Sequence, residues 1–120
     1  TAETAIQAAL TGHLMVSTHY LRTGDVRDIY LDIIHELVHV KQYRDGKELF
    51  EDGYEYPDLP TEIEAYRACV AEGRRLGMND RELFEYLKVF WMNDRDVRRR
   101  ARHVGVRAPS HRPRRGRAKR

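Results

Sequence analysis

The sequence predicts a single α+β domain that is mainly helical, with a small N-terminal β-ribbon or edge strand packed on a central helix. Its 120 residues suffice for one domain with one modest hydrophobic core. Between residues 26 and 43, apolar side chains recur at intervals of three and four, which is typical of a buried helix. Residues 13–21, HLMVSTHYL, are instead rich in β-branched and aromatic residues, as strands are.

The first half of the chain is expected to run from a helix through a strand to a second helix. Residues 2–10 are mostly good helix formers, so we expect a short helix before the strand. The long helix that follows begins near Val26 and ends near Gly46, because glycine readily adopts the left-handed conformation that closes helices. Glycine, proline and acidic residues between positions 47 and 60 then predict a loop.

The second half of the chain predicts three more helices. The first begins at Thr61, whose hydroxyl and the Glu64 side chain match the capping-box pattern, and it runs to about Leu76. The other two begin at a repeated motif, MNDREL at 78–83 and MNDRDV at 92–97. In each copy an Asn or Asp can cap the helix, and an acidic residue in the first turn favours the helix dipole.

These last two helices are expected to span about residues 80–92 and to end before Gly105. Residues 1–104 therefore form the predicted domain. Residues 105–120 have prolines, small residues and charge but little to bury, which predicts a basic, flexible C-terminal tail.

Charge is divided unevenly along the chain. Residues 1–94 hold 10 Lys and Arg against 18 Asp and Glu, a balance of −8, whereas residues 95–120 hold 12 against one, a balance of +11. Three interpretations of the basic segment stay open: a solvated extension, a sequence-independent contact with nucleic acid, and an intramolecular contact between the tail and the active-site cleft.

The single cysteine, Cys69, excludes a disulfide within the chain and favours a reducing compartment, so we expect a cytoplasmic protein. No stretch approaches the roughly 18 apolar residues of a membrane-spanning helix. Cys69 itself has small and apolar neighbours in the sequence, which predicts a packing role rather than a reactive thiol or a metal ligand.

The central helix carries the motif HELVH at residues 35–39. On a helix, His35 and His39 project from one face one turn apart and can reach the same zinc ion, while Glu36 lies beside the metal. Zinc lowers the pKa of its bound water to about 7, and the neighbouring carboxylate can take the proton as that water attacks a carbonyl. The alternative is that the two histidines form local hydrogen bonds and Glu36 reaches solvent.

A catalytic zinc ion needs a third protein ligand, and the helix after Thr61 offers Glu62 and Glu64. On a helical wheel Glu62 falls in the middle of the apolar arc, whereas Glu64 falls among polar and small residues. We therefore expect Glu62 to be the ligand. Each glutamate also has an alternative role. Glu62 can be an acidic first-turn residue that interacts favourably with the helix dipole, and Glu64 can belong to the capping box.

The HELVH motif and the run EIEAY at residues 62–66 resemble the gluzincin clan of zinc metallopeptidases. In the CAAX prenyl proteases and HtpX-type proteases of that clan, the segment E-x-E-A-D begins with the third metal ligand, which matches Glu62 here. Small size and the lack of membrane spans make the chain similar to the archaeal minigluzincins, soluble minimal relatives of those catalytic cores. The resemblance covers roughly residues 26–104.

This resemblance implies a minimal zincin fold with one Zn²⁺ ion per chain, held by His35, His39 and Glu62, and with Glu36 as the catalytic base. It also implies that residues 13–21 form the edge strand that holds an extended peptide substrate. The resemblance to the minigluzincins also implies latency, with a C-terminal segment obstructing the active-site cleft. Its pattern has Asp where this chain has Tyr66, so either Tyr66 or Asp32 is expected to orient a zinc-bound histidine.

Two functions are consistent with these residues. The first is a zinc metalloendopeptidase, either active or latent, that acts on a peptide or protein substrate. Tyr54, Tyr56 and His103 are its candidate oxyanion donors by chemistry alone. The second is a non-catalytic zinc-stabilised module whose basic arm binds nucleic acid or another polyanion. The role of Glu36 as a catalytic base distinguishes the two functions. The number of protein ligands does so too, because structural zinc sites normally have four.

Overall fold

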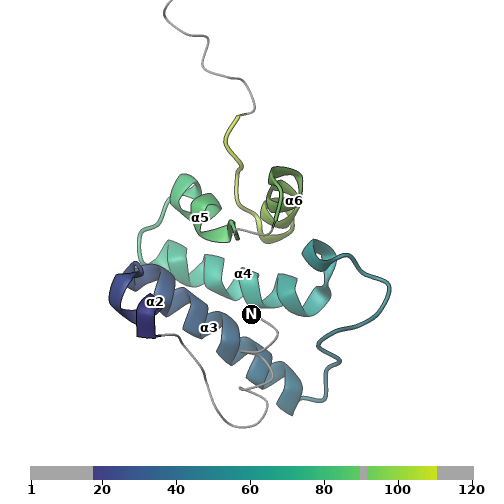
Figure 1. The fold of residues 1–120 in the computed structure, drawn as a ribbon. Coiled ribbons are helices and arrows are strands. Elements are labelled where there is room, and N and C mark those ends of the chain that lie inside the picture. The colour runs from purple at the N-terminus through teal and green to yellow at the C-terminus, as the bar shows by residue number, and fades with distance from the viewer. Residues whose placement is uncertain (1–17, 90–91, 111–120) are drawn as a thin grey trace, which may run out of the picture.

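The computed structural model describes residues 18–89 and 92–110, and all regular elements in these ranges are helices (Figure 1). In chain order these are the α-helices α2 (Thr18–Thr23) and α3 (Val26–Arg44), the short 3₁₀ helix η1 (Tyr56–Asp58), and the α-helices α4 (Pro60–Arg75), α5 (Asp80–Leu87) and α6 (Asp94–Val104).

The expected α+β class with a β-ribbon or edge strand is wrong, because the described residues contain no strand and no sheet. Thr18–Thr23, which belong largely to the stretch expected as a strand, form helix α2 instead. A short run of β-branched and aromatic residues does not by itself distinguish a strand from a helix, since β-propensity mainly reflects packing on neighbouring strands. Residues 13–17 and the expected helix at 2–10 lie outside the described residues.

Helix α4 forms the centre of the fold, between α3 on one side and α5 and α6 on the other (Figure 1). Small residues on α4 permit the close approach to α3. The Cys69 thiol donates a hydrogen bond to the Leu31 carbonyl oxygen at 3.2 Å. Burial raises the pKa of this thiol to about 12, so Cys69 is an unreactive packing residue at neutral pH.

Gly73 marks the tightest part of this packing. A Cβ atom at this position would lie 2.7 Å from Leu83 Cδ2 and 3.5 Å from Leu31 Cδ1. The core continues from there between α4, α5 and α6, where the buried apolar side chains include Val70, Met78, Leu83, Phe84, Leu87, Val97, Ala101 and Val104.

The helix ends follow the sequence in part. Asn79 and Glu82 form a complete capping box at the start of α5, Asn93 caps α6, and α6 ends at Gly105 in the left-handed conformation, with φ 73°. The capping box expected at Thr61 is wrong: α4 begins at Pro60, and the Thr61 hydroxyl donates to the Leu49 carbonyl oxygen.

The chain remains packed on the body for a few residues beyond Gly105. Val106 is buried in the core, and the Arg107 amide donates to the Asp80 carboxylate at 2.9 Å. The Pro109 carbonyl oxygen accepts a hydrogen bond from Arg98. Within the described residues, no helix combines the length and the apolar character that crossing a bilayer requires.

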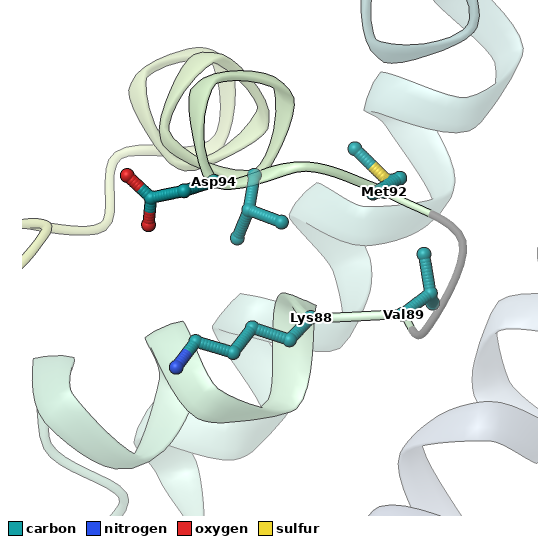
Figure 2. A pocket seen from close by; sticks show the side chains of 5 residues that line it. Lys88, Val89, Met92 and Asp94 are labelled. Carbon is teal, nitrogen blue, oxygen red and sulfur yellow. The ribbon is translucent and has the colours of Figure 1, made fainter.

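A hollow of about 430 Å³ lies between the end of α5 and the start of α6 (Figure 2). It is lined by Lys88, Val89, Met92, Asp94 and Val97. None of these lining residues belongs to the HELVH motif, and Glu62 does not line the hollow either.

Candidate metal centre

Helix α3 directs His35 and His39 toward α4, as their four-residue spacing requires. The two rings meet edge to face, with centroids 4.6 Å apart. Together with Glu62 of α4 they offer three ligand atoms that all lie within 4.8 Å of one another. All three residues are buried, and the exposed fractions of the whole residues are 6% for His35, 1% for His39 and 3% for Glu62. This His-His-Glu group could hold a metal ion.

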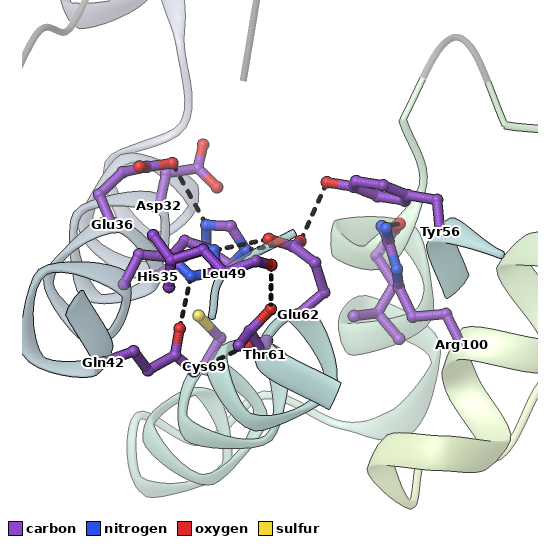
Figure 3. A network of polar contacts seen from close by, with 12 residues as sticks. Asp32, His35, Glu36, Gln42, Leu49, Tyr56, Thr61, Glu62, Cys69 and Arg100 are labelled. Atoms are coloured by element: carbon purple, nitrogen blue, oxygen red, sulfur yellow. Dashed lines mark hydrogen bonds and ion pairs between the residues drawn. The ribbon is translucent and has the colours of Figure 1, made fainter. Parts of the chain in front are cut away.

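Glu62 lies in the first turn of α4 and points into the interface with α3 (Figure 3). Its Oε2 lies 3.2 Å from His35 Nε2, and its Oε1 lies 2.6 Å from His39 Nε2. Glu64, by contrast, is exposed and forms an ion pair with Lys47 at 3.0 Å. The inward carboxylate is therefore Glu62, as the helical wheel indicates.

Gln42 determines which nitrogen of His39 carries the proton. The Gln42 amide nitrogen donates to the Thr61 carbonyl oxygen at 2.9 Å and to Glu64 Oε1 at 2.8 Å, two groups that only accept hydrogen bonds. The Gln42 oxygen therefore faces His39 Nδ1, at 2.8 Å, and must accept its proton. In the neutral ring His39 Nε2 therefore carries a lone pair, and in the imidazolium it carries a second proton.

This lone pair points to a carboxylate. His39 Nε2 is buried and has no hydrogen-bond partner among the described residues, although Glu62 Oε1 lies only 2.6 Å away. Two lone pairs at this distance repel each other unless a proton or a metal cation lies between them. A second proton on the ring or a metal cation can occupy this position, and the combination of two imidazoles and a carboxylate suits zinc and other first-row transition metals.

His35 is enclosed by two carboxylates. Its Nδ1 lies 3.3 Å from Glu36 Oε1, on the side opposite Glu62. Burial alone would lower the pKa of His35, but hydrogen bonds and charge interactions with Glu36 and Glu62 outweigh it and raise the pKa to about 9. Burial likewise opposes ionisation of Glu62, yet contacts with the two histidines hold its pKa well below the usual range.

One carboxylate oxygen of Glu36 is available to accept a hydrogen bond. Its Oε2 is buried and has no hydrogen-bond partner in the described part of the chain. A carboxylate oxygen without a donor is costly to bury. It lies beside the histidine pair, so it can accept a proton from a group that enters the site.

Two tyrosines border the group. The Tyr56 hydroxyl donates to Glu62 Oε2 at 3.0 Å, and the ring of Tyr66 packs on the ring of His35 with centroids 4.4 Å apart. Behind both rings lies the buried guanidinium of Arg100, 4.1 Å from the centre of Tyr66 and 5.5 Å from that of Tyr56. This cation adds positive potential on the far side of the tyrosines from the carboxylates.

Either Tyr66 or Asp32 was expected to orient a histidine. The Nδ1 atoms are instead contacted by Glu36 and Gln42, and both ring nitrogens of each histidine already have a close neighbour. Tyr66 contacts His35 through its ring, and Asp32 accepts a hydrogen bond from the Tyr86 hydroxyl at 2.8 Å.

The three expected oxyanion donors are placed very differently. Tyr56 lies at the group, held there because η1 is attached to α6 by ion pairs of Asp58 with Arg99 and His103. His103 is thus engaged with Asp58, and Tyr54 is exposed.

Sequence reasoning did not identify the role of Gln42. The signal was its position three residues after His39, which places an amide on the same helix face as the motif. The contacts that orient this amide come from Thr61 and Glu64 of another helix, which no local pattern shows.

Comparison of the chain with protein-family models, with curated proteins and with solved structures found no match.

Proposed function

We propose that this protein is a zinc-dependent metallopeptidase in which His35, His39 and Glu62 hold the metal and Glu36 is the general base. One observation carries the proposal most directly. His39 Nε2 and Glu62 Oε1 lie 2.6 Å apart in a buried site, and Gln42 accepts the proton of His39 Nδ1, so that only a second proton on the ring or a metal cation can join these two atoms. A metal cation there would be held by two imidazoles and a carboxylate.

The ligand number supports a catalytic rather than a structural ion. Among the described residues the group has three members, and catalytic zinc sites typically have three protein ligands, whereas structural sites have four. A zinc ion held by these residues would lower the pKa of a coordinated water to about 7 and polarise the carbonyl of a peptide.

Glu36 has the position and the free acceptor that a general base requires. Its Oε1 contacts His35, which restrains the side chain, while its Oε2 has no partner in the described part of the chain. The carboxylate accepts a proton from the attacking water and then donates it to the amine that leaves.

Tyr56 supplies a donor on the opposite side. Burial, together with the negative charge of Glu62, raises the pKa of the Tyr56 hydroxyl far above neutral pH, so it stays protonated. In the proposed reaction this proton turns away from Glu62 Oε2 and is donated to the oxygen on which negative charge develops. We expect Tyr56→Phe to lower kcat by about 10²–10³-fold with metal content unchanged.

The test of the proposal combines metal content with hydrolysis of casein or a quenched peptide, on the whole chain and on Glu36→Gln. We expect one zinc per chain in both, and hydrolysis at least about 100-fold lower in the variant, because general-base catalysis contributes about 10²–10⁴-fold. Glu85→Gln is the matched control, since it removes the charge of an exposed glutamate on α5 whose partner is Lys88.

Latency is part of the proposal, with the C-terminal segment as the obstruction. Removal of residues 111–120 should then increase hydrolysis, and equal activity with and without them would contradict latency. Bound zinc without hydrolysis in any of these forms would overturn the peptidase and favour the non-catalytic zinc-stabilised module. Absence of zinc binding would overturn both.

A further inference from the structure

We propose that the C-terminal end of α6, with the basic segment that follows it, binds the phosphate backbone of duplex nucleic acid. This inference concerns a surface formed by α4, α6 and the segment after α6. It does not depend on the proposed hydrolytic function.

Helix α4 contributes two arginines to the end of α6. Arg67 Nε donates to the His103 carbonyl oxygen at 3.1 Å, and Arg74 Nη2 donates to the Gly105 carbonyl oxygen at 2.9 Å. The last carbonyl groups of a helix carry partial negative charge, which accounts for the attraction. Each guanidinium has five N–H donors, so these contacts leave donors over for a ligand.

The chain after α6 brings in a third arginine and α6 itself a fourth. The Arg107 amide and Arg74 Nη1 donate to the two oxygens of the same carboxylate, Asp80, at 2.9 and 2.7 Å. Arg102 is exposed in the last turn of α6. We call Arg67, Arg74, Arg102 and Arg107 the arginine surface.

This surface has an excess of positive charge. In the described part of the chain, Arg74 forms an ion pair with Asp80, whereas Arg67, Arg102 and Arg107 form none within 4.0 Å. Elsewhere in the described part of the chain many cations are paired with acidic residues, as in Arg27–Glu82, Arg75–Glu72, Lys88–Glu85 and Arg99–Asp58. Arg22, Arg44, Arg81 and Arg95 are exposed and form no such pair among the described residues, but they lie on other parts of the helices, whereas three unpaired arginines are found together where α6 ends.

The basic segment begins at the same place. Burial of Val106 and the hydrogen bond from Arg98 to the Pro109 carbonyl oxygen, at 2.7 Å, hold the chain against α6 up to this point. Residues 111–120 then add five arginines and one lysine with no acidic residue. A ligand on the arginine surface therefore lies next to the attachment point of six further cations.

The composition indicates phosphate as the ligand group. Arginine predominates over lysine, and the planar guanidinium matches two oxygens of a phosphate at once. Residues 92–120 contain no Phe, Trp or Tyr on which unpaired bases could stack, which favours a duplex over a single strand. They also lack the large apolar side chains with which a membrane-surface helix inserts into lipid.

The test is binding of the whole chain to a fluorescein-labelled duplex of about 20 base pairs, followed by anisotropy between about 50 and 200 mM salt. DNA and RNA duplexes are compared, together with a single strand, poly-glutamate and vesicles containing phosphatidylserine. The substituted protein is Arg102→Gln/Arg107→Gln. The matched control is Arg22→Gln/Arg44→Gln, which removes two exposed arginines from α2 and α3.

We expect the double variant at the arginine surface to weaken duplex binding roughly 10-fold or more and to reduce the salt slope by about 2, one for each lost phosphate contact. The control should leave both quantities unchanged. A variant of the whole chain with the six cations of residues 111–120 changed to Gln should reduce the slope further.

Three outcomes would overturn the inference: no duplex binding at the lowest salt, equal losses in the variant and its control, or tighter binding to poly-glutamate or vesicles. All measurements are made on chelated protein and repeated on Glu36→Gln. Failure here would therefore leave the proposed hydrolytic site untouched, and loss of hydrolysis would leave duplex binding intact.

Discussion

Two clusters in this molecule join histidine to carboxylate at almost the same distance, yet they differ in how their hydrogen-bond donors and acceptors are matched. In the His-His-Glu group, His39 Nε2 lies 2.6 Å from Glu62 Oε1. In the cluster that attaches η1 to α6, which we call the surface cluster, His103 Nε2 lies 2.8 Å from Asp58 Oδ1. The side chains of Glu62 and Asp58 are 4% and 23% exposed, respectively.

The decisive difference is the balance of donors and acceptors. In the surface cluster, Asp58 receives hydrogen bonds from both Arg99 and His103, so its oxygens are matched by donors. In the buried group, the proton of His39 is held by Gln42, and the free oxygen of Glu36 has no partner among the described residues. The acceptors of the surface cluster are thus matched by its own donors, whereas the buried group could hold a metal ion.

The largest effect is expected from Glu62→Gln. This change removes the carboxylate that both histidines contact, and loss of one partner from a buried ion pair typically costs about 3–5 kcal/mol. Zinc affinity should fall by more than the roughly 10–100-fold typical of residues outside the ligand set. Metal content after gel filtration and thermal unfolding measure the two effects. Asp58→Asn, the matched change in the surface cluster, should keep one zinc per chain.

The next effect is stabilisation by the metal itself. Zinc at about 100 times its Kd should raise the free energy of unfolding by about 2.7 kcal/mol, which corresponds to roughly 10 °C in Tm for a chain of this size. Differential scanning calorimetry of chelated protein before and after zinc addition gives this value. An identical shift in Glu62→Gln would mean that zinc binds elsewhere.

A smaller effect is expected from Gln42→Met, which keeps the volume and removes the group that orients His39. Zinc affinity should fall about 10–100-fold, as is typical when a ligand histidine loses its orienting partner. Competition with a chromogenic chelator measures the affinity. Glu64→Ala removes only the outer acceptor of Gln42, so an equal loss there would assign the effect to the outer network.

The smallest effect concerns the surface cluster, because exposed ion pairs contribute little to stability. The hydrogen bond from His103 and those from Arg99 lower the pKa of Asp58 below its ordinary value of 3.8. A carboxyl group with a lowered folded-state pKa stabilises the fold above its ordinary pKa and loses that contribution as the pH falls. Wild type should therefore unfold at most a few degrees above Asp58→Asn at pH 6, and the difference should vanish near pH 2. A difference that grows toward low pH would contradict the assignment.

Much of the fold and of the candidate site could be predicted from local pattern. The three- and four-residue spacing between 26 and 43 corresponds to α3, and the repeated MNDR motif corresponds to the starts of α5 and α6. His35 and His39 share a face because of helix geometry alone, and Glu62 faces inward because of its place on the wheel.

The incorrect predictions concern conformations and hydrogen bonds that are decided by residues distant in the sequence. Thr18–Thr23 form a helix although the run resembles a strand, and the Thr61 hydroxyl bonds to Leu49 rather than capping its own helix. In both cases a local propensity of a fraction of a kcal/mol competes with packing and hydrogen bonds formed by residues distant in the sequence.

The sequence by itself thus determined that two histidines and a glutamate would be directed toward one another, because helical periodicity is a local property. Only the tertiary structure decided that their ligand atoms lie close enough together to hold a metal ion. The proton on His39 is placed by Gln42, the Gln42 amide is oriented by Thr61 and Glu64 on another helix, and Tyr56 is held at Glu62 by η1. Hydrogen-bond direction depends on which acceptors burial brings together, and that is settled when α3 packs against α4.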